Sequence, residues 1–142
     1  MLAKALTARK INAPSAKVWD TVSRIGRLDV WFPSISACSV EGTGVGAIRS
    51  LTFVDGTKAT DRVEQVDHEH RRVVYNRFAS PFPVSSYIGT VEVLESFDGL
   101  AVVVWTVDLE LEQGVRDAVV TRLEQGIGNA LIGMQTDLAN GV

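Results

Sequence analysis

Polar and apolar residues alternate with a period of two through the middle of the chain, which is the pattern of half-buried β-strands. A looser alternation over residues 3–11 predicts one more strand ahead of them. The six later strands are predicted at Ala37–Glu41, Ala47–Val54, Lys58–Asp67, Arg71–Ala79, Ser86–Ser96 and Ala101–Leu111. Short turns between successive strands, such as Asp55-Gly56, predict an antiparallel meander.

Apolar residues take a helical spacing on both sides of this meander. Residues 14–22 predict a short helix that begins at a proline, and residues 28–32 predict a second short helix or turn. From about Gln113 a stripe of period 3.6 predicts one long amphipathic helix. That stripe consists of Val115, Val119, Val120, Leu123, Ile127, Ala130, Leu131, Met134 and Leu138. The expected class is α+β.

The last strand indicates which face of the sheet is buried. Its alternate residues are apolar, and the residues between them include Asp108 and Glu110. The apolar set is Ala101, Val103, Trp105, Val107, Leu109 and Leu111. One face therefore packs on a core and the other meets water.

The same parity places three charged side chains on the buried face. A turn centred on Gly56 sets Leu51 opposite Asp61 and Arg49 on its diagonal, and the next hairpin sets Arg77 close to opposite Asp61. A lone buried carboxylate would be costly, whereas a paired one is tolerated. Two arginines against one aspartate leave a positive surplus, which a ligand carboxylate, a phenolate or water would meet.

Composition and charge narrow the function classes. The 142 residues include 14 basic and 17 acidic ones, giving a net charge of -3, and 46% are hydrophobic. This size predicts a single domain over residues 1–142. No basic surplus points to nucleic acid, and no long apolar stretch predicts membrane insertion. With one cysteine and no apolar leader, a cytoplasmic protein is expected, as a monomer or homodimer.

Several short motifs carry a resemblance that extends over essentially the whole chain. They are Ile11-Asn12-Ala13-Pro14, Val18-Trp19-Asp20, Trp31-Phe32-Pro33-Ser34-Ile35, Gly44-Val45-Gly46 with Ile48-Arg49, and Asp61-Arg62-Val63. Together with the order of elements, they resemble the START/Bet v 1-like (SRPBCC) superfamily, in particular its bacterial polyketide cyclase/dehydrase and lipid-transport members. The resemblance implies a helix-grip fold: a seven-stranded antiparallel sheet curved around the long C-terminal helix, enclosing an apolar cavity.

Plant abscisic-acid receptors look like a distant subgroup of the same superfamily. A pocket arginine, a glutamate, an aromatic residue and a tyrosine of those receptors correspond to Arg49, Asp61, Tyr75 and Tyr87. Phe32 stands where they have a carboxylate-binding lysine, and Trp105 replaces another pocket glutamate. Their gate sequence is replaced by Asp55-Gly56-Thr57-Lys58, so hormone sensing of that kind is not expected.

Two functional hypotheses follow. The first is a carrier or sensor that binds a lipid, isoprenoid or polyketide-like molecule without a cofactor or metal. The second is a cofactor-free polyketide cyclase/dehydratase, in which Arg49 or Arg77 stabilises an enolate and a tyrosine or Asp61 moves protons. No histidine is placed near the cavity, which favours binding. The expected ligand-binding residues are Trp31, Arg49, Leu51, Phe53, Asp61, Tyr75, Arg77, Tyr87 and Trp105.

Each candidate site also has a purely structural explanation. The charged residues also fit an ion-pair network inside the sheet, and the aromatic residues fit an ordinary core. His68 and His70 are expected in a solvated turn rather than at a metal. Residues 80–85 are interpreted either as a lid or as a rigid loop. A protein that acts only through its surface remains the third functional reading.

Overall fold

Seven antiparallel strands form one sheet with the order β1-β7-β6-β5-β4-β3-β2 in the computed structural model, which describes residues 1–141. The strands are β1 (Leu2–Pro14), β2 (Ile35–Glu41), β3 (Ile48–Phe53), β4 (Lys58–Asp67), β5 (Arg72–Ala79), β6 (Ser86–Glu95) and β7 (Leu100–Glu110). The first strand thus pairs with the last, and β2 forms the other edge.

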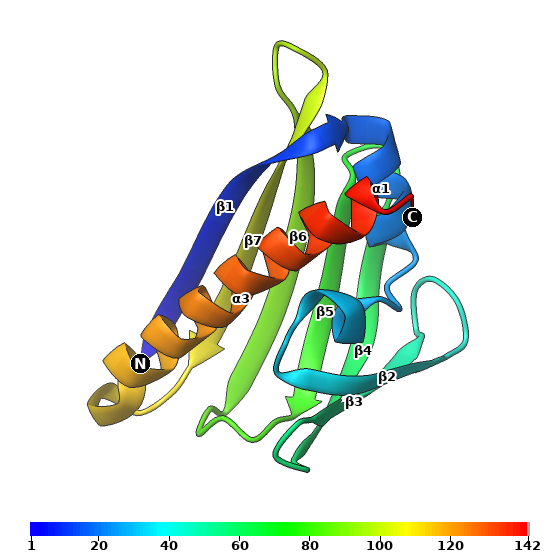
Figure 1. Ribbon diagram of the computed structural model, residues 1–142. Helices are drawn as coiled ribbons and strands as arrows, with labels where there is room; N and C mark the ends of the chain where they lie inside the picture. The colour runs from blue at the N-terminus through cyan, green and yellow to red at the C-terminus, as the bar shows by residue number, and fades with distance from the viewer. Residues whose placement is uncertain (142) are drawn as a thin grey trace.

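One face of this sheet is covered by the long helix α3 (Arg116–Ala139), which follows a short 3₁₀ turn at Gln113–Val115. Figure 1 shows α3 running diagonally across the curved sheet, with α1 (Ser15–Ser23) beside its C-terminal end. The short helix α2 (Leu28–Trp31) packs on both α3 and β2. None of the helices within residues 1–141 has the length and apolar character needed to cross a bilayer.

The predicted helix-grip architecture is confirmed, including both short helices after the first strand. The predicted parity is confirmed as well, because the inward residues of β6 and β7 are buried in strict alternation. The element ends differ modestly. β1 is longer than the predicted residues 3–11, and the regular part of the last helix begins at Arg116 rather than Gln113.

The register of the β3–β4 hairpin corrects one prediction. Leu51 lies opposite Ala59, and it is Arg49 that lies opposite Asp61. The turn is centred on Asp55 rather than Gly56, because Asp55 Oδ1 accepts hydrogen bonds from the Thr57 backbone N–H at 3.0 Å and from Thr57 Oγ1 at 2.6 Å. Moving the centre by one residue moves every pairing by two.

The contact between α2 and α3 depends on a buried carboxylate and a glycine. Asp137 of α3 accepts two hydrogen bonds from Arg27, both at 2.7 Å, and one from the Trp31 indole at 3.0 Å. The Arg27 guanidinium holds the pKa of this carboxyl below its usual range. At Gly133 the helices come so close that a Cβ atom would lie 2.3 Å from the Trp31 carbonyl oxygen.

We expect Gly133→Ala to destabilise the protein. Although alanine is the better helix former, its Cβ would push the backbone of α2 away from α3, at a cost of about 1–3 kcal/mol in the free energy of unfolding. The matched control is Gly128→Ala, whose Cβ would meet only Thr7 at an ordinary 4.0 Å, and which should gain up to about 1 kcal/mol. Urea denaturation measures both, and equal gains would contradict the packing argument.

Candidate ligand-binding cavity

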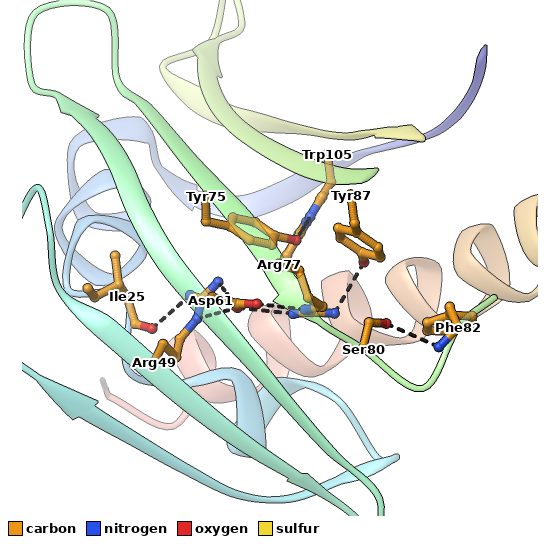
Figure 2. A network of polar contacts seen from close by, with 9 residues as sticks. All are labelled: Ile25, Arg49, Asp61, Tyr75, Arg77, Ser80, Phe82, Tyr87 and Trp105. Carbon is orange, nitrogen blue, oxygen red and sulfur yellow. Dashed lines mark hydrogen bonds and ion pairs between the residues drawn. The ribbon is translucent and has the colours of Figure 1, made fainter. Parts of the chain in front are cut away.

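Asp61 on β4 is 0% exposed and lies between two arginines from the neighbouring strands (Figure 2). Arg77 of β5 donates from Nε to Oδ1 at 2.7 Å and from Nη2 to Oδ2 at 3.1 Å. Arg49 of β3 donates from Nε to Oδ2 at 2.9 Å, and its Nη2 lies 2.8 Å from the same oxygen without hydrogen-bonding geometry. The carboxylate therefore joins three adjacent strands.

The charge of this cluster is one positive unit. Burial alone would raise the pKa of Asp61, but the charges and hydrogen bonds of Arg77 and Arg49 outweigh burial and lower it. Asp61 therefore stays ionised and neutralises only one of the two guanidinium groups. A net charge left inside a protein is costly unless another group compensates it.

Two tyrosines extend the cluster across the sheet. Arg77 donates from Nη1 to the Tyr87 hydroxyl oxygen at 3.2 Å, and the Trp105 indole donates to the Tyr75 hydroxyl oxygen at 3.1 Å. Each hydroxyl oxygen is the acceptor in these contacts, which leaves its proton for donation. Burial raises the pKa of Tyr87 well above its usual range, so this hydroxyl remains protonated.

The Tyr75 ring occupies space that Gly89 leaves open on the neighbouring strand. A Cβ atom at Gly89 would lie 2.0 Å from the Tyr75 ring carbon that carries the hydroxyl. The guanidinium of Arg49 lies 4.7 Å from the centre of that ring, and the guanidinium of Arg77 lies 5.5 Å from it. The absence of a side chain at Gly89 thus lets the phenol lie flat between the sheet and the arginines.

At its far end the cluster reaches the turn between α1 and α2. Arg49 donates from Nη1 to the Ile25 carbonyl oxygen at 2.9 Å. Ile25 has φ of 60°, a left-handed conformation that costs a β-branched residue on the order of 1–3 kcal/mol. Its buried side chain and the bond from Arg49 hold it there, so the charged cluster also fixes the start of the second helix.

Beside Arg77 the structure encloses a cavity of about 520 Å³ between the sheet and α3, which we call the inner cavity. This volume is within the range of small-molecule sites. Its mouth is formed by the β3–β4 turn, the loop over residues 80–85 and α3. Its lining residues are Phe32, Ser34, Ile35, Phe53, Val54, Asp55, Thr57, Tyr75, Arg77, Pro81, Phe82, Tyr87, Arg122, Leu123, Gln125, Gly126, Ile127 and Asn129.

Four of the nine predicted ligand-binding residues line the inner cavity: Phe53, Tyr75, Arg77 and Tyr87. Four others, Arg49, Leu51, Asp61 and Trp105, are buried behind this lining, and the two charged ones act on the cavity through Arg77. Trp31 lies apart from it, because its indole is bonded to Asp137. Contact of any of these residues with a ligand stays a prediction.

Sequence reasoning missed the polar residues and the glycine that α3 contributes to the lining. Arg122, Gln125, Gly126 and Asn129 face the cavity, although only Leu123 and Ile127 belong to the predicted apolar stripe. The glycines inside the predicted helix were the only available signal. Gly126 lines the cavity, and a Cβ there would meet nothing within 4 Å.

Phe82 in the loop over residues 80–85 closes part of the mouth. Its half-buried ring lies 6.5 Å from the Tyr87 ring, and the Arg122 guanidinium of α3 lies 5.1 Å from the Phe82 ring centre. The loop is therefore packed against both the sheet and the helix. Its movement as a lid stays a prediction.

Both histidines lie outside the cavity lining. His68 accepts a hydrogen bond on Nδ1 from the Trp19 indole at 3.1 Å, and exposed His70 lies 2.8 Å from Asp67. Within residues 1–141, no three His, Cys, Asp or Glu side chains gather in a way that would hold a metal ion. Asp55 at the mouth is the one carboxylate among the lining residues described.

A curved antiparallel sheet that grips a long helix around a cavity defines the helix-grip class of ligand-binding proteins. The model of the polyketide cyclase/dehydrase and lipid transport family matches residues 3–139, so the chain belongs to that family. This confirms the superfamily that the sequence motifs indicated.

Individual relatives are more distant. The abscisic acid receptor PYL2 of Arabidopsis thaliana is 28% identical over an alignment of 110 residues, which covers 74% of this chain and 58% of the receptor. The structure of a protein from Bacillus thuringiensis shares the fold with a TM-score of 0.84 at 22% identity, covering 95% of this chain and 98% of that one. Norcoclaurine synthase from Thalictrum flavum does so with a TM-score of 0.81 at 17% identity, covering 98% and 87%.

We expect Asp61→Ala to lower the free energy of unfolding by about 3–5 kcal/mol, because it leaves two guanidinium groups buried without a counter-charge. Asp61→Asn, which keeps an acceptor oxygen, should lose less. The control is Asp108→Ala on the outer face, where a half-exposed carboxylate lies 3.4 Å from Lys4 and contributes less than about 1 kcal/mol. Urea denaturation of the three variants measures this, and equal losses at both positions would contradict it.

Proposed function

We propose that the protein is a carrier or sensor that binds a small, largely apolar or aromatic molecule in the inner cavity. One observation carries the proposal: Arg77, a member of a buried cluster with one surplus positive charge, lies at the wall of a cavity that is also lined by aliphatic and aromatic side chains. Apolar sites with a few fixed polar groups are typical of small-molecule binding. Membership of a family described by lipid transport and polyketide cyclisation supports the same class of ligand.

The polar groups favour a ligand that carries an acceptor oxygen. Arg77 can donate only, and the hydroxyl protons of Tyr75 and Tyr87 are left for donation. A carboxylate, phenolate or ketone oxygen at this point would receive these hydrogen bonds, and an anionic one would also balance the surplus charge. The rest of the ligand would pack against side chains such as Leu123 and Ile127 of α3.

The position of the acidic groups favours binding over catalysis. Asp61 is fully buried, both its oxygens accept hydrogen bonds from arginines, and its pKa is lowered, so it is poorly placed to exchange protons with a ligand. Asp55 lies at the mouth, and its hydrogen bonds from Thr57 lower its pKa too. Neither Asp61 nor Asp55 therefore supplies a general base with a pKa near neutrality.

A matched pair of fluorescent probes tests this proposal. We expect 8-anilinonaphthalene-1-sulfonate to bind about tenfold or more tightly than the neutral N-phenyl-1-naphthylamine, because only the sulfonate can pair with Arg77. Tyr87→Phe removes one donor and should narrow the difference between the two dissociation constants. Fluorescence titration measures both probes on each variant.

The location of the probe is tested by filling the cavity. Gly126→Leu places a side chain in open space at the cavity wall and should weaken both probes. Gly114→Leu is the matched control, because it also meets nothing within 4 Å but lies in the exposed turn before α3. Equal affinity for the neutral and anionic probes, or unchanged binding to Gly126→Leu, would refute the proposal.

A second candidate is a cofactor-free polyketide cyclase or dehydratase. Its support is the family description, together with donors at Arg77 and Tyr87 that would stabilise a developing enolate oxygen. A structure of norcoclaurine synthase, which shares this fold, contains bound dopamine and hydroxybenzaldehyde. The fold therefore accommodates aromatic molecules in that enzyme.

We expect binding without turnover when a linear aromatic poly-β-ketone is incubated with the protein, because Asp55, the one carboxylate among the described lining residues, has a lowered pKa and is a weak base. The compound should be recovered unchanged, as measured by chromatography with mass spectrometry against a protein-free control. Faster cyclisation or loss of water that disappears in both Tyr87→Phe and Arg49→Ala would favour the enzyme. Turnover that persists in the Tyr87→Phe/Arg49→Ala double variant would exclude these residues from catalysis.

A further inference from the structure

A second depression lies outside the inner cavity, between α2 and α3. It has a volume of about 460 Å³, and we call it the α2–α3 groove. Its lining residues are Asp29, Val30, Trp31, Phe32, Pro33, Ile35, Asn129, Ile132, Gly133, Thr136, Asp137 and Asn140. Three of them, Phe32, Ile35 and Asn129, also line the inner cavity, so the two spaces share a wall.

Phe32 is the bulky part of that wall. It is the residue that ends α2, its backbone is extended, and its ring is half-buried. The ring meets the buried Trp105 indole edge to face, with the centroids 5.5 Å apart and the planes at 87°. One side of Phe32 therefore faces the inner cavity and the other faces the groove. Ile35 is buried beside it, while Asn129 is exposed on α3.

Exposed aliphatic side chains lie on both sides of the groove. Val30 of α2 is 48% exposed and Ile132 of α3 is 49% exposed. Val30 and Ile132 form the apolar floor of the groove together with Phe32, Pro33 and Ile35. Polar residues of both helices surround this floor. Covering exposed aliphatic surface is favourable in proportion to the area removed from water. An apolar chain bound along this floor would bury aliphatic surface of both α2 and α3, which favours its binding.

We propose that Phe32 is the partition that sets the length of the ligand: in the unmodified protein its ring confines the ligand to the inner cavity and keeps it out of the α2–α3 groove. When the side chain of Phe32 is truncated, the groove receives the far end of an alkyl or isoprenoid chain whose oxygen-bearing end lies at Arg77. The shared wall of the two spaces carries this inference. It rests on the proposed function, because it takes the inner cavity to be the site of the polar end.

The fold makes Phe32 a suitable partition. Arg27 and Trp31 hold α2 to Asp137, and Gly133 brings α3 against the Trp31 carbonyl, so the helix backbones on both sides of the ring are fixed. The contact of the ring with Trp105 is a single edge-to-face packing. Truncating the side chain of Phe32 would therefore open the wall while the backbone stays in place.

A series of straight-chain carboxylates tests the inference by isothermal titration calorimetry, with octanoate, dodecanoate and hexadecanoate kept below micelle-forming concentrations. In the unmodified protein we expect affinity to rise with chain length and then level off when the inner cavity is full. In Phe32→Ala it should keep rising to hexadecanoate, by about fourfold for each additional methylene that is buried.

Two variants make the result specific. Phe78→Ala removes an exposed phenyl ring of β5 that lines neither the inner cavity nor the groove, and it should keep the length at which affinity levels off. Adding Ile132→Glu to Phe32→Ala places a charge on the groove floor, so it should abolish the gain for hexadecanoate and leave octanoate unchanged.

The outcomes separate this inference from the proposed function. Absence of octanoate binding to the unmodified protein would overturn the proposed function, and this inference with it. Octanoate binding combined with the same limiting length in Phe32→Ala would overturn the inference alone. It would also be overturned if the gain for hexadecanoate survived Ile132→Glu, or if the unmodified protein had no limiting length.

Discussion

The buried carboxylate of Asp61 is the constraint on which the rest of the site depends. With no access to water, it is stable only as an ion held by opposite charges, and the sheet supplies these from the strands on either side. Arg49 then reaches the strained Ile25 carbonyl, while Arg77 reaches Tyr87. A single charge thus links three central strands to the turn that positions α2 and to the wall of the inner cavity. Because every member of this chain is hydrogen-bonded to the next, the polar end of the cavity is rigid before any ligand arrives.

The same cluster explains why the inner cavity is polar at one end. If the sheet had a second carboxylate beside Asp61, the charges would cancel and the site would be an ion-pair network with no need of a ligand. One carboxylate against two guanidinium groups leaves the cluster with one surplus positive charge, and Arg77 is the charged member that faces the cavity. The tyrosines beside it contribute donors without charge. The wall opposite is formed by α3, which contributes the aliphatic side chains of Leu123 and Ile127 as well as the polar side chains of Arg122, Gln125 and Asn129.

Strand parity made much of this predictable from the sequence. A period of two leaves only two choices for each strand, and the alternation within β7 and β6 indicated the inward face, including Tyr87. For β5 the pattern left both choices open, and the expected pairing of Arg77 with Asp61 favoured inward Tyr75 and Arg77. The register of β3 was less accessible, since a local hydrogen bond from Thr57 to Asp55 moved the turn and replaced Leu51 by Arg49 opposite Asp61. The polar side chains that α3 contributes to the lining were not predictable, because they depend on where the helix crosses the sheet, whereas the resemblance to the plant receptors had already indicated Phe32 as a pocket position. That crossing is set by contacts distant in sequence, such as Asp137 with Arg27 and Trp31.

Two glycines in α3 show how that crossing keeps the inner cavity open. At Gly133 the missing side chain lets the helix touch the Trp31 backbone, and Asp137 fixes the contact one turn later. At Gly126, two turns earlier, the missing side chain faces open space at the cavity wall. The helix is therefore held tightly at its C-terminal half and stands clear of β5 and β6 at its N-terminal half. Each glycine costs about 1 kcal/mol of helix stability relative to alanine. The first is offset by close packing of α2, whereas a Cβ atom at the second would meet nothing within 4 Å in residues 1–141. Under the proposed function, contact with a ligand would offset the cost of the second.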